Sequence, residues 1–148
     1  QLIANTTQLN TVGSALSGLD SVHAMTDVTG FGLLGHLLEM CRGAGLAAGL
    51  QFDQVPVLSA ALPLAQQGYG PGAIERNLGS YGHEVDFAAH LENWQRRVLA
   101  DAQTSGGLLA AVAPGSVDQV LSAFRDAGFA QAAVIGTMKQ GAPRVAVI

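Results

Sequence analysis

Apolar side chains recur every three or four residues in several parts of the chain, which is the spacing that gathers them on one face of a helix. Four leucines between residues 33 and 38 form such a face, and two glycines follow shortly afterwards as stop signals. Residues 116–127 repeat the pattern with Val117, Val120 and Phe124. The spacing predicts helices over residues 9–19, 33–40, 59–67, 88–99 and 116–127.

Short apolar or alternating runs, bounded by glycine, proline or polar residues, are typical of strands. Such runs occupy residues 22–27, 46–52, 108–112, 132–137 and 145–148, and a weaker strand or turn begins at Val85. A polar turn separates the last two runs, which predicts a closing hairpin. Residues 68–82 are rich in glycine and proline and are expected to form an ordered loop.

Strands and helices alternate irregularly, which predicts a sandwich in which helices cover a sheet. The short closing hairpin favours a mixed or antiparallel sheet over a doubly wound one, so the expected fold class is α+β. A length of 148 residues suits a single domain, 1–148, whose core is large enough to need neither disulfides nor a structural metal.

Charge is sparse along the whole chain. Charged residues make up only 12%, about half the ~25% of an average globular protein. Mean hydropathy is correspondingly high, at +0.30. Because large exposed apolar areas usually mark interfaces, we expect part of this surface to be covered. The net charge of −4 and the absence of a basic cluster argue against a nucleic-acid partner.

No apolar run in the sequence reaches the ~18–20 residues that a membrane-spanning helix needs, so no membrane partner is expected. Cys41 is the only cysteine, which excludes an internal disulfide and a thiolate zinc cluster and indicates a cytoplasmic protein. Its position beside Met40, on the apolar side of a helix, is typical of a buried and inert thiol.

Residues 26–32 read TDVTGFG and lie where a strand is expected to end and a helix to begin. The free N–H groups of a helix's first turn attract anions such as phosphate. A carboxylate beside such a site is favourable when a magnesium ion lies between them, because magnesium commonly takes one or two carboxylates together with phosphate oxygens. Asp27 is therefore a candidate magnesium ligand. On spacing alone, a simpler alternative is at least as common: Asp27 or Thr29 caps the helix, and the glycines allow close packing.

A second polar segment, QTSGG at residues 103–107, precedes the expected strand 108–112. Its hydroxyl and amide groups could contact a polar ligand or a neighbouring domain, or could only form a turn before a buried strand. Arg76 and Asn77 could likewise bind a phosphate, or merely cap and solvate their loop. His36 lacks metal-ligand spacing to the other histidines, but it lies one turn into the helix that follows the TDVTGFG segment.

Three motifs together resemble those of the selenophosphate synthetase (selenide, water dikinase) family. Residues 26–36, TDVTGFGLLGH, resemble one signature of that family, and residues 103–109, QTSGGLL, resemble a second. Pro71-Gly72 with Arg76-Asn77 resembles a third. The motifs follow the family's order but cover only its C-terminal domain, which has the fold of aminoimidazole ribonucleotide synthetase-like proteins. The resemblance therefore implies that a catalytic N-terminal domain lies outside this chain.

The resemblance implies an enzyme that converts ATP, selenide and water to selenophosphate, AMP and phosphate, with magnesium as cofactor. The partners would be ATP, selenide and the protein's own N-terminal domain, and the full-length protein would form a homodimer. By the motif match, Asp27 would bind magnesium, and no catalytic residue would lie in this chain. The residues expected to shape the nucleotide cleft are Thr29, Gly30, Gly32, Thr104, Ser105, Gly106 and Gly107.

The chain departs from the family pattern at two positions, with Ala102 where a proline is common and Ala73 where a second glycine is common. Neither change removes a charge or a hydroxyl, although each alters the expected local backbone geometry. Two other functions stay open at this point. One is a sister ATP-dependent synthetase with another acceptor, and the other is a non-catalytic binding domain that kept the fold.

The first prediction concerns the chain by itself. We expect it to be inactive and to bind magnesium-ATP weakly or not at all, because one carboxylate cannot organise a magnesium-nucleotide site alone. Titration calorimetry with ATP, in the presence and absence of magnesium, checks this. Tight, magnesium-dependent binding to the isolated chain would contradict it.

Overall fold

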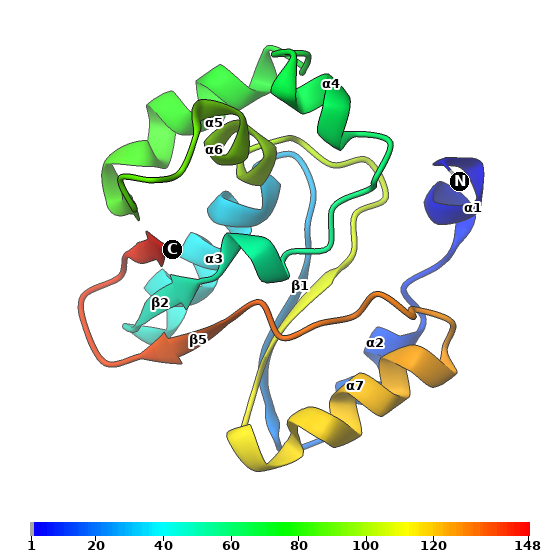
Figure 1. Ribbon diagram of the computed structural model, residues 1–148. Coiled ribbons are helices and arrows are strands. Elements are labelled where there is room, and N and C mark those ends of the chain that lie inside the picture. Colours follow the sequence, from blue (N-terminus) through cyan, green and yellow to red (C-terminus); the bar gives the residue numbers. More distant parts are fainter. Residues whose placement is uncertain (1) are drawn as a thin grey trace.

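The computed structural model describes residues 2–148 (Figure 1). Six strands form: β1 (Val22–Asp27), β2 (Ala47–Leu50), β3 (Val85–Phe87), β4 (Leu108–Val112), β5 (Gly136–Lys139) and β6 (Val145–Val147). The α-helices are α1 (Leu2–Thr7), α2 (Val12–Leu16), α3 (Gly32–Ala44), α4 (Leu62–Gln66), α5 (Ala73–Tyr81), α6 (Asn93–Leu99) and α7 (Val117–Asp126). Three short 3₁₀ turns are η1 (Phe52–Gln54), η2 (Gly82–Glu84) and η3 (Pro114–Ser116). Within the described residues, no helix is both long and apolar enough to cross a membrane.

The strands form two separate sheets. β1 and β4 pair antiparallel as a two-stranded ribbon, in which Val22 lies opposite Val112 and Asp27 lies opposite Leu108. The second sheet has the order β3-β6-β2-β5. Its β6 strand runs parallel to both β2 and β3, whereas β5 runs antiparallel to β2. The expected α+β class with a mixed sheet is confirmed.

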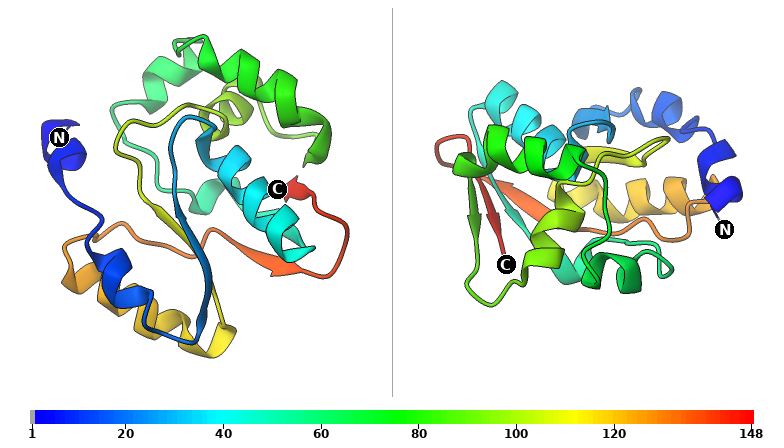
Figure 2. Two further views of the ribbon diagram at one scale, coloured as in Figure 1. Left: turned by 180° about the vertical axis from the view of Figure 1, so that it is seen from behind. Right: turned by 90° about the horizontal axis from the view of Figure 1, so that it is seen from above.

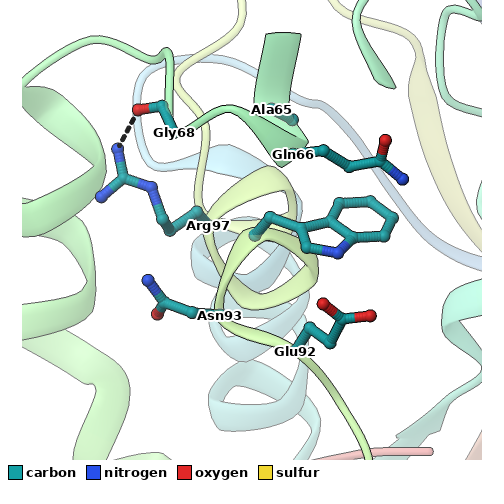
Figure 3. A pocket seen from close by; sticks show the side chains of 7 residues that line it. Ala65, Gln66, Gly68, Glu92, Asn93 and Arg97 are labelled. Atoms are coloured by element: carbon teal, nitrogen blue, oxygen red, sulfur yellow. Dashed lines mark hydrogen bonds between the residues drawn. The ribbon is translucent and has the colours of Figure 1, made fainter. Parts of the chain in front are cut away.

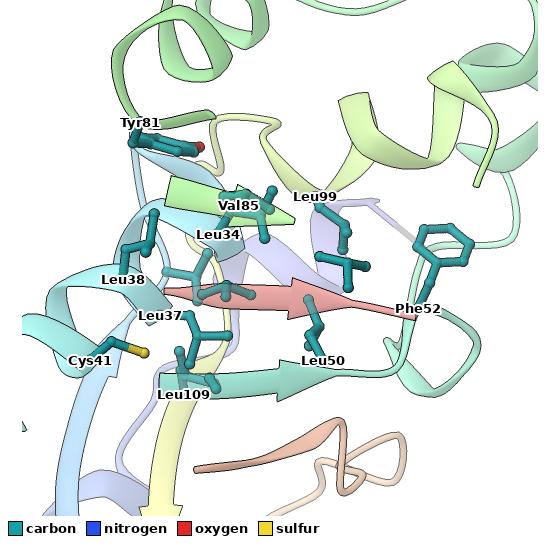
Figure 4. Packing of buried hydrophobic residues seen from close by; sticks show 14 of the residues in the cluster. Leu34, Leu37, Leu38, Cys41, Leu50, Phe52, Tyr81, Val85, Leu99 and Leu109 are labelled. Carbon is teal, nitrogen blue, oxygen red and sulfur yellow. The ribbon is translucent and has the colours of Figure 1, made fainter. Parts of the chain in front are cut away.

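The main apolar core lies between α3 and the four-stranded sheet (Figure 4). The buried face of α3 includes Leu34 and Leu38, each with no exposed surface, and these pack in one cluster with Leu50, Val145 and Val147 of the sheet. Cys41 belongs to the same cluster, and burial raises the pKa of its thiol above the ordinary value. The predicted burial of this cysteine is therefore confirmed.

A smaller core lies on the other side of the ribbon. Its buried members are Val12 and Leu16 of α2 and Val120 of α7, against which parts of β1 and β4 pack. Figure 1 shows α2 and α7 together on this side, while α4, α5 and α6 gather at the opposite end of the molecule. The β1–β4 ribbon is thus packed between the two cores and connects them.

The predicted closing hairpin is wrong. β5 and β6 do not pair with each other, because β2 lies between them: Leu50 is opposite Gly136 of β5 on one side and Val147 of β6 on the other. A polar turn between two short strands is typical of a hairpin, but here the turn connects strands that pair on opposite sides of β2. Nonlocal parallel pairing of β6 with β2 and β3 buries Val145 and Val147 completely, which a hairpin at the sheet edge would not do.

The expected loop over residues 68–82 is also wrong over most of its length, because α5 occupies Ala73–Tyr81. Ile74, Asn77 and Tyr81 are spaced three and four residues apart and are all buried, so they define the inner face of this helix. The helical spacing was hard to recognise in the sequence because Asn77 is polar and glycines surround the segment. The helix begins only after Pro71-Gly72, which keeps the preceding turn non-helical.

Other helices differ from prediction mainly in length. Only Val12–Leu16 is helical within the expected helix 9–19. The expected helix 88–99 begins at Asn93, because Glu92 supplies a capping box in which its side chain and that of Gln95 bond each other's backbone N–H groups. The ion pair between Arg97 and Glu75 joins α6 to α5.

The packing of α3 generates the second prediction. Replacing Leu38 with Ala should lower the free energy of unfolding by about 2–5 kcal/mol, because it opens a cavity in the main core. Leu64→Ala on α4 is the matched control, since the Leu64 side chain is 52% exposed and its loss should cost less than about 1 kcal/mol. Urea denaturation of both variants measures the difference. Equal losses would show that this core does not carry the stability.

Candidate functional site

The two glycine-containing segments lie side by side in the structure, and we call residues 27–32 and 101–107 the paired loops. The Val28 N–H donates to the Gly107 carbonyl at 2.9 Å, and the Gln103 N–H donates to the Thr29 carbonyl at 3.0 Å. These bonds continue the β1–β4 pairing past its last matched residues, Asp27 and Leu108. Figure 2 shows the ribbon from which both segments extend, with β1 in blue and β4 in yellow. The two motifs predicted from the sequence therefore form one site.

Two glycines permit this close approach. A Cβ at Gly106 would lie 2.0 Å from the Val28 carbonyl oxygen, which no side chain could tolerate. At Gly32, φ is +69° and a Cβ would lie 2.7 Å from the Ala100 carbonyl carbon. Gly30 and Gly107, by contrast, have open space where a Cβ would be. The packing role considered for the glycines of the first segment is thus confirmed at Gly32 and wrong at Gly30, and the close approach at Gly106 was not expected.

Helix α5 anchors the paired loops from one side. Asn77 donates through Nδ2 to the carbonyls of Gly30 and Ala100, at 2.9 and 3.0 Å. The Tyr81 hydroxyl donates to the Phe31 carbonyl at 2.6 Å. Burial raises the pKa of this phenol to about 12, so it remains a donor across the physiological range. From α5, these two buried side chains hold the first loop against Ala100, the residue that precedes the second loop.

Neither role suggested for the Arg76-Asn77 pair describes Asn77, which is buried and binds backbone rather than solvent or phosphate. Tyr81 was not identified from the sequence at all. Reading residues 74–81 as one helix would have placed Asn77 and Tyr81 on the same inner face as Ile74, and this was the available signal. On the other side, Asn10 Nδ2 donates to the Gly106 carbonyl at 2.9 Å.

Asp27 ends β1 with an exposed side chain. Within residues 2–148 its carboxylate has no hydrogen-bond or ion-pair partner, so both oxygens are open to a ligand. The suggested capping role is wrong, because α3 begins at Gly32 with Phe31 in the cap position and no side chain bonds its first turn. A free carboxylate at the end of a fixed strand is consistent with a ligand-binding function.

Of the two carboxylates in the paired loops, Asp27 and Asp101, only Asp27 is exposed, so it is the candidate ligand for magnesium. Within the described part of the chain, no three His, Cys, Asp or Glu side chains gather closely enough to hold a metal ion. The donor chemistry suits a hard cation that takes one carboxylate here and its other oxygens from a nucleotide, water or another domain. It does not suit a metal held by this chain alone.

Most of the other predicted site residues lie at the surface of the paired loops. Gly30, Thr104, Ser105 and Gly107 are exposed, while Thr29 is half-buried. Ser105 has φ of +56°, a left-handed conformation that turns the second loop at its most exposed point. Gln103 and Gly107, which flank these two hydroxyl residues, pair with Thr29 and Val28, so the exposed rim of the second loop lies close to the part of the first loop that follows Asp27.

A half-buried carboxylate with one fully buried oxygen lies at the base of the second loop. Asp101 Oδ1 has no hydrogen-bond partner among the described residues, although Gln103 Nε2 donates to the Asp101 backbone carbonyl at 3.1 Å and, more weakly, to its other carboxylate oxygen at 3.4 Å. Burial raises the pKa of Asp101 above its ordinary value. The sequence indicated no role for this residue.

Three side chains behind the first loop form a chain of polar contacts. The Thr29 hydroxyl lies 3.1 Å from Nε2 of His36, and Nδ1 of the same ring lies 3.0 Å from Oε2 of Glu39. The His36 side chain is buried, with only 6% of its surface exposed. The histidine that the sequence singled out one turn into the helix therefore contacts the first loop directly. The sequence did not indicate Glu39.

A shallow hollow of about 390 Å³ lies elsewhere, between α4 and α6 (Figure 3). Its lining residues are Ala65, Gln66, Gly68, Glu92, Asn93, Trp94 and Arg97. None of them belongs to the paired loops. The Arg97 side chain reaches across to the Gly68 carbonyl, as the dashed line in Figure 3 marks, and its pairing with Glu75 gives it a structural role.

Residues 4–148 match the protein family described as "AIR synthase related protein, C-terminal domain". The chain belongs to this family. Its paired loops and mixed sheet are therefore features of an AIR synthase related C-terminal domain. The fold expected from the motif resemblance is confirmed.

Sequence relatives carry a more specific name. A protein of Burkholderia pseudomallei named "Selenide, water dikinase" is 52% identical over 147 residues, which is 99% of this chain and 42% of that protein. One of the same name from Pseudomonas straminea is 51% identical, over 99% of this chain and 41% of that protein. The resemblance found in the motifs is confirmed by these relatives. The chain spans less than half of their length.

Solved structures share the fold at much lower identity. The crystal structure of the hydrogenase maturation protein HypE in complex with ATP superposes with a TM-score of 0.60 at 19% identity, over 94% of this chain and 36% of that one. The E. coli HypE structure gives a TM-score of 0.63 at 18% identity, over 92% of this chain and 34% of that one. These similarities show the architecture alone. The site residues Asp27, Thr29, Gly30, Gly32, Thr104, Ser105, Gly106 and Gly107 stay predictions.

The third prediction uses two neighbouring glycines. Gly106→Ala should destabilise the protein by at least about 1–3 kcal/mol, because its Cβ would overlap the Val28 carbonyl and force the paired loops apart. Gly107→Ala is the matched control and should be close to neutral, since nothing lies within 4 Å of its Cβ position. Thermal unfolding measures the stability, and amide exchange at Val28 reports the pairing. Equal behaviour of the two variants would refute the close approach.

Proposed function

We propose that this chain is the C-terminal domain of an ATP-dependent selenophosphate synthetase, which converts ATP, selenide and water to selenophosphate, AMP and phosphate. The exposed Asp27 carboxylate on the rigid paired loops is the observation that carries the proposal. The names of relatives about 50% identical over this whole chain support the same reaction.

In this proposal, the paired loops hold one carboxylate at a fixed position. The Asp27 backbone is anchored through β1, and the loop beyond it is anchored by Asn77 and Tyr81, so the carboxylate needs little reordering when it binds. Magnesium bound there would neutralise negative charge on the nucleotide phosphates. The remaining oxygen ligands would come from the phosphates and from the rest of the longer protein.

The exposed rim of the paired loops would close over the nucleotide. Gly30 and Gly107 leave the backbone open to a ligand, and Thr104 and Ser105 offer hydroxyl groups that can donate to phosphate oxygens. The other side of this cleft would be the protein's own N-terminal domain. The low charge content of the chain is consistent with such an interdomain face.

A second candidate is a sister ATP-dependent synthetase with a different acceptor. It is favoured by one observation, the shared fold with a HypE protein whose structure contains ATP. The nucleotide product separates the two candidates, because a sister synthetase would release ADP without any need for selenide.

The fourth prediction tests the proposal on the full-length protein that carries this chain. With ATP and magnesium, AMP should accumulate only when selenide is added. Asp27→Ala should lower turnover at least ~100-fold, the scale of removing one electrostatic stabiliser. Asp118→Ala is the control: Asp118 is also exposed, but it lies on α7 and should have no effect.

Each outcome points to a different function. ADP formed regardless of selenide would replace the proposal with the sister synthetase. No turnover of any kind would favour a non-catalytic binding domain. Selenide-dependent AMP with an unchanged Asp27→Ala variant would keep the reaction but remove Asp27 from the magnesium site.

A further inference from the structure

Thr29, His36 and Glu39 connect the first of the paired loops to the body of α3. The distances are 3.1 Å from the Thr29 hydroxyl to Nε2 of His36 and 3.0 Å from Nδ1 of His36 to Oε2 of Glu39. The ring is almost fully buried, whereas the Glu39 side chain is half-exposed at the far end. The arrangement therefore runs from the candidate ligand site, through a buried imidazole, to a carboxylate at the surface.

The chemistry of the three groups sets the direction of the hydrogen bonds. An ionised carboxylate only accepts hydrogen bonds, so Nδ1 of His36 must carry a proton to donate to Glu39. In the neutral ring, Nε2 is then bare and accepts from the Thr29 hydroxyl. The hydroxyl proton of Thr29 is thereby directed at the ring, and the lone pairs of its oxygen stay free to accept a hydrogen bond or to bind a cation.

We propose that His36 and Glu39 are positioning residues that make Thr29 a pure hydrogen-bond acceptor at the ligand site. Thr29 lies two residues beyond Asp27 in the same loop. In this proposal its hydroxyl oxygen is a second oxygen beside that carboxylate. Such an oxygen suits a magnesium ion or a water bound to it, and it does not suit a phosphate oxygen, which needs a donor. This inference rests on the proposed magnesium-dependent function.

Support of the loop alone does not require these three side chains. The Thr29 carbonyl already accepts the N–H groups of Gln103 and Gly32, and Asn77 holds the next carbonyl. Position 36 lies among leucines on the buried face of α3, where an apolar residue would pack without the cost of burying a polar ring. A role for the two polar contacts is therefore to be sought on the ligand side of Thr29.

The tautomer is the first test, and it needs no turnover. NMR of isotope-labelled histidine in the full-length protein distinguishes a protonated from a bare ring nitrogen, and loss of the signal in His36→Gln assigns it. We expect a proton on Nδ1 and none on Nε2. A proton on Nε2 would overturn the proposal, because Thr29 would then accept from the ring and donate to the ligand.

The fifth prediction concerns magnesium dependence. Two variants test it: Thr29→Val, which removes the hydroxyl at nearly constant volume, and Glu39→Ala. Each should raise the magnesium concentration for half-maximal turnover about 10–100-fold, the range found when supporting groups around a metal are lost. Glu39→Gln should keep the magnesium dependence close to that of the wild-type protein, since its amide oxygen can still accept a hydrogen bond from Nδ1. Thr137→Val on β5, where the threonine is exposed and far from the paired loops in sequence, is the control and should change nothing.

A double variant of Thr29 and Glu39 distinguishes a positioning role from a purely structural one. The double variant Thr29→Val with Glu39→Ala should be little worse than either single variant, because both break the same connection. Additive losses, or lower thermal stability with unchanged magnesium dependence, would make the contacts purely structural. A phosphorylated Thr29 after incubation with ATP would make the hydroxyl a nucleophile and would also overturn the proposal.

These results are independent of the reaction itself. If the wild-type protein forms no AMP from ATP and selenide, the proposed function fails, while the histidine NMR still tests the direction of the hydrogen bonds. If AMP forms but the magnesium dependence of Thr29→Val is normal, only the positioning inference fails.

Discussion

The contact between Gly106 and the carbonyl of Val28 is the constraint on which the rest of the site depends. The two backbone segments approach so closely there that no side chain fits between them. This approach lets the β1–β4 pairing continue past Asp27 into the paired loops. It also joins motifs almost eighty positions apart in the sequence. Without it, Asp27 and the rim at Thr104 and Ser105 would have no common framework.

The cores on the two sides of the ribbon give this framework its rigidity. On one side, α3 and the mixed sheet bury Val28 and Leu109, and α5 reaches over them to bind the loop carbonyls. On the other side, α2 and α7 pack against the ribbon. A flexible pair of loops could not hold a single carboxylate in place, whereas a ribbon fixed from both sides can.

Much of the fold follows from local patterns. β1, β4, α3 and α7 were predictable because each has a clear period and clear end signals, such as the glycines that follow α3. α5 was missed because Asn77 interrupts its apolar face. The order β3-β6-β2-β5 could not be predicted, since the pairing of β6 depends on burial of Val145 and Val147 between distant strands rather than on its own sequence. At the site, both motifs were recognisable, but their direct contact and the roles of Asn77, Tyr81 and Glu39 require the three-dimensional structure.

The position of β6 has a consequence for how the chain folds during synthesis. This strand is formed by residues 145–147, yet it lies inside the sheet between β3 and β2. Until the ribosome has released those residues, two neighbouring strands keep unpaired edges and the main core is open on one side. Such a delay exposes strand edges to other chains and increases dependence on chaperones. Final closure of the domain must therefore wait until residues 145–147 have been made, even though its loops and helices are made much earlier.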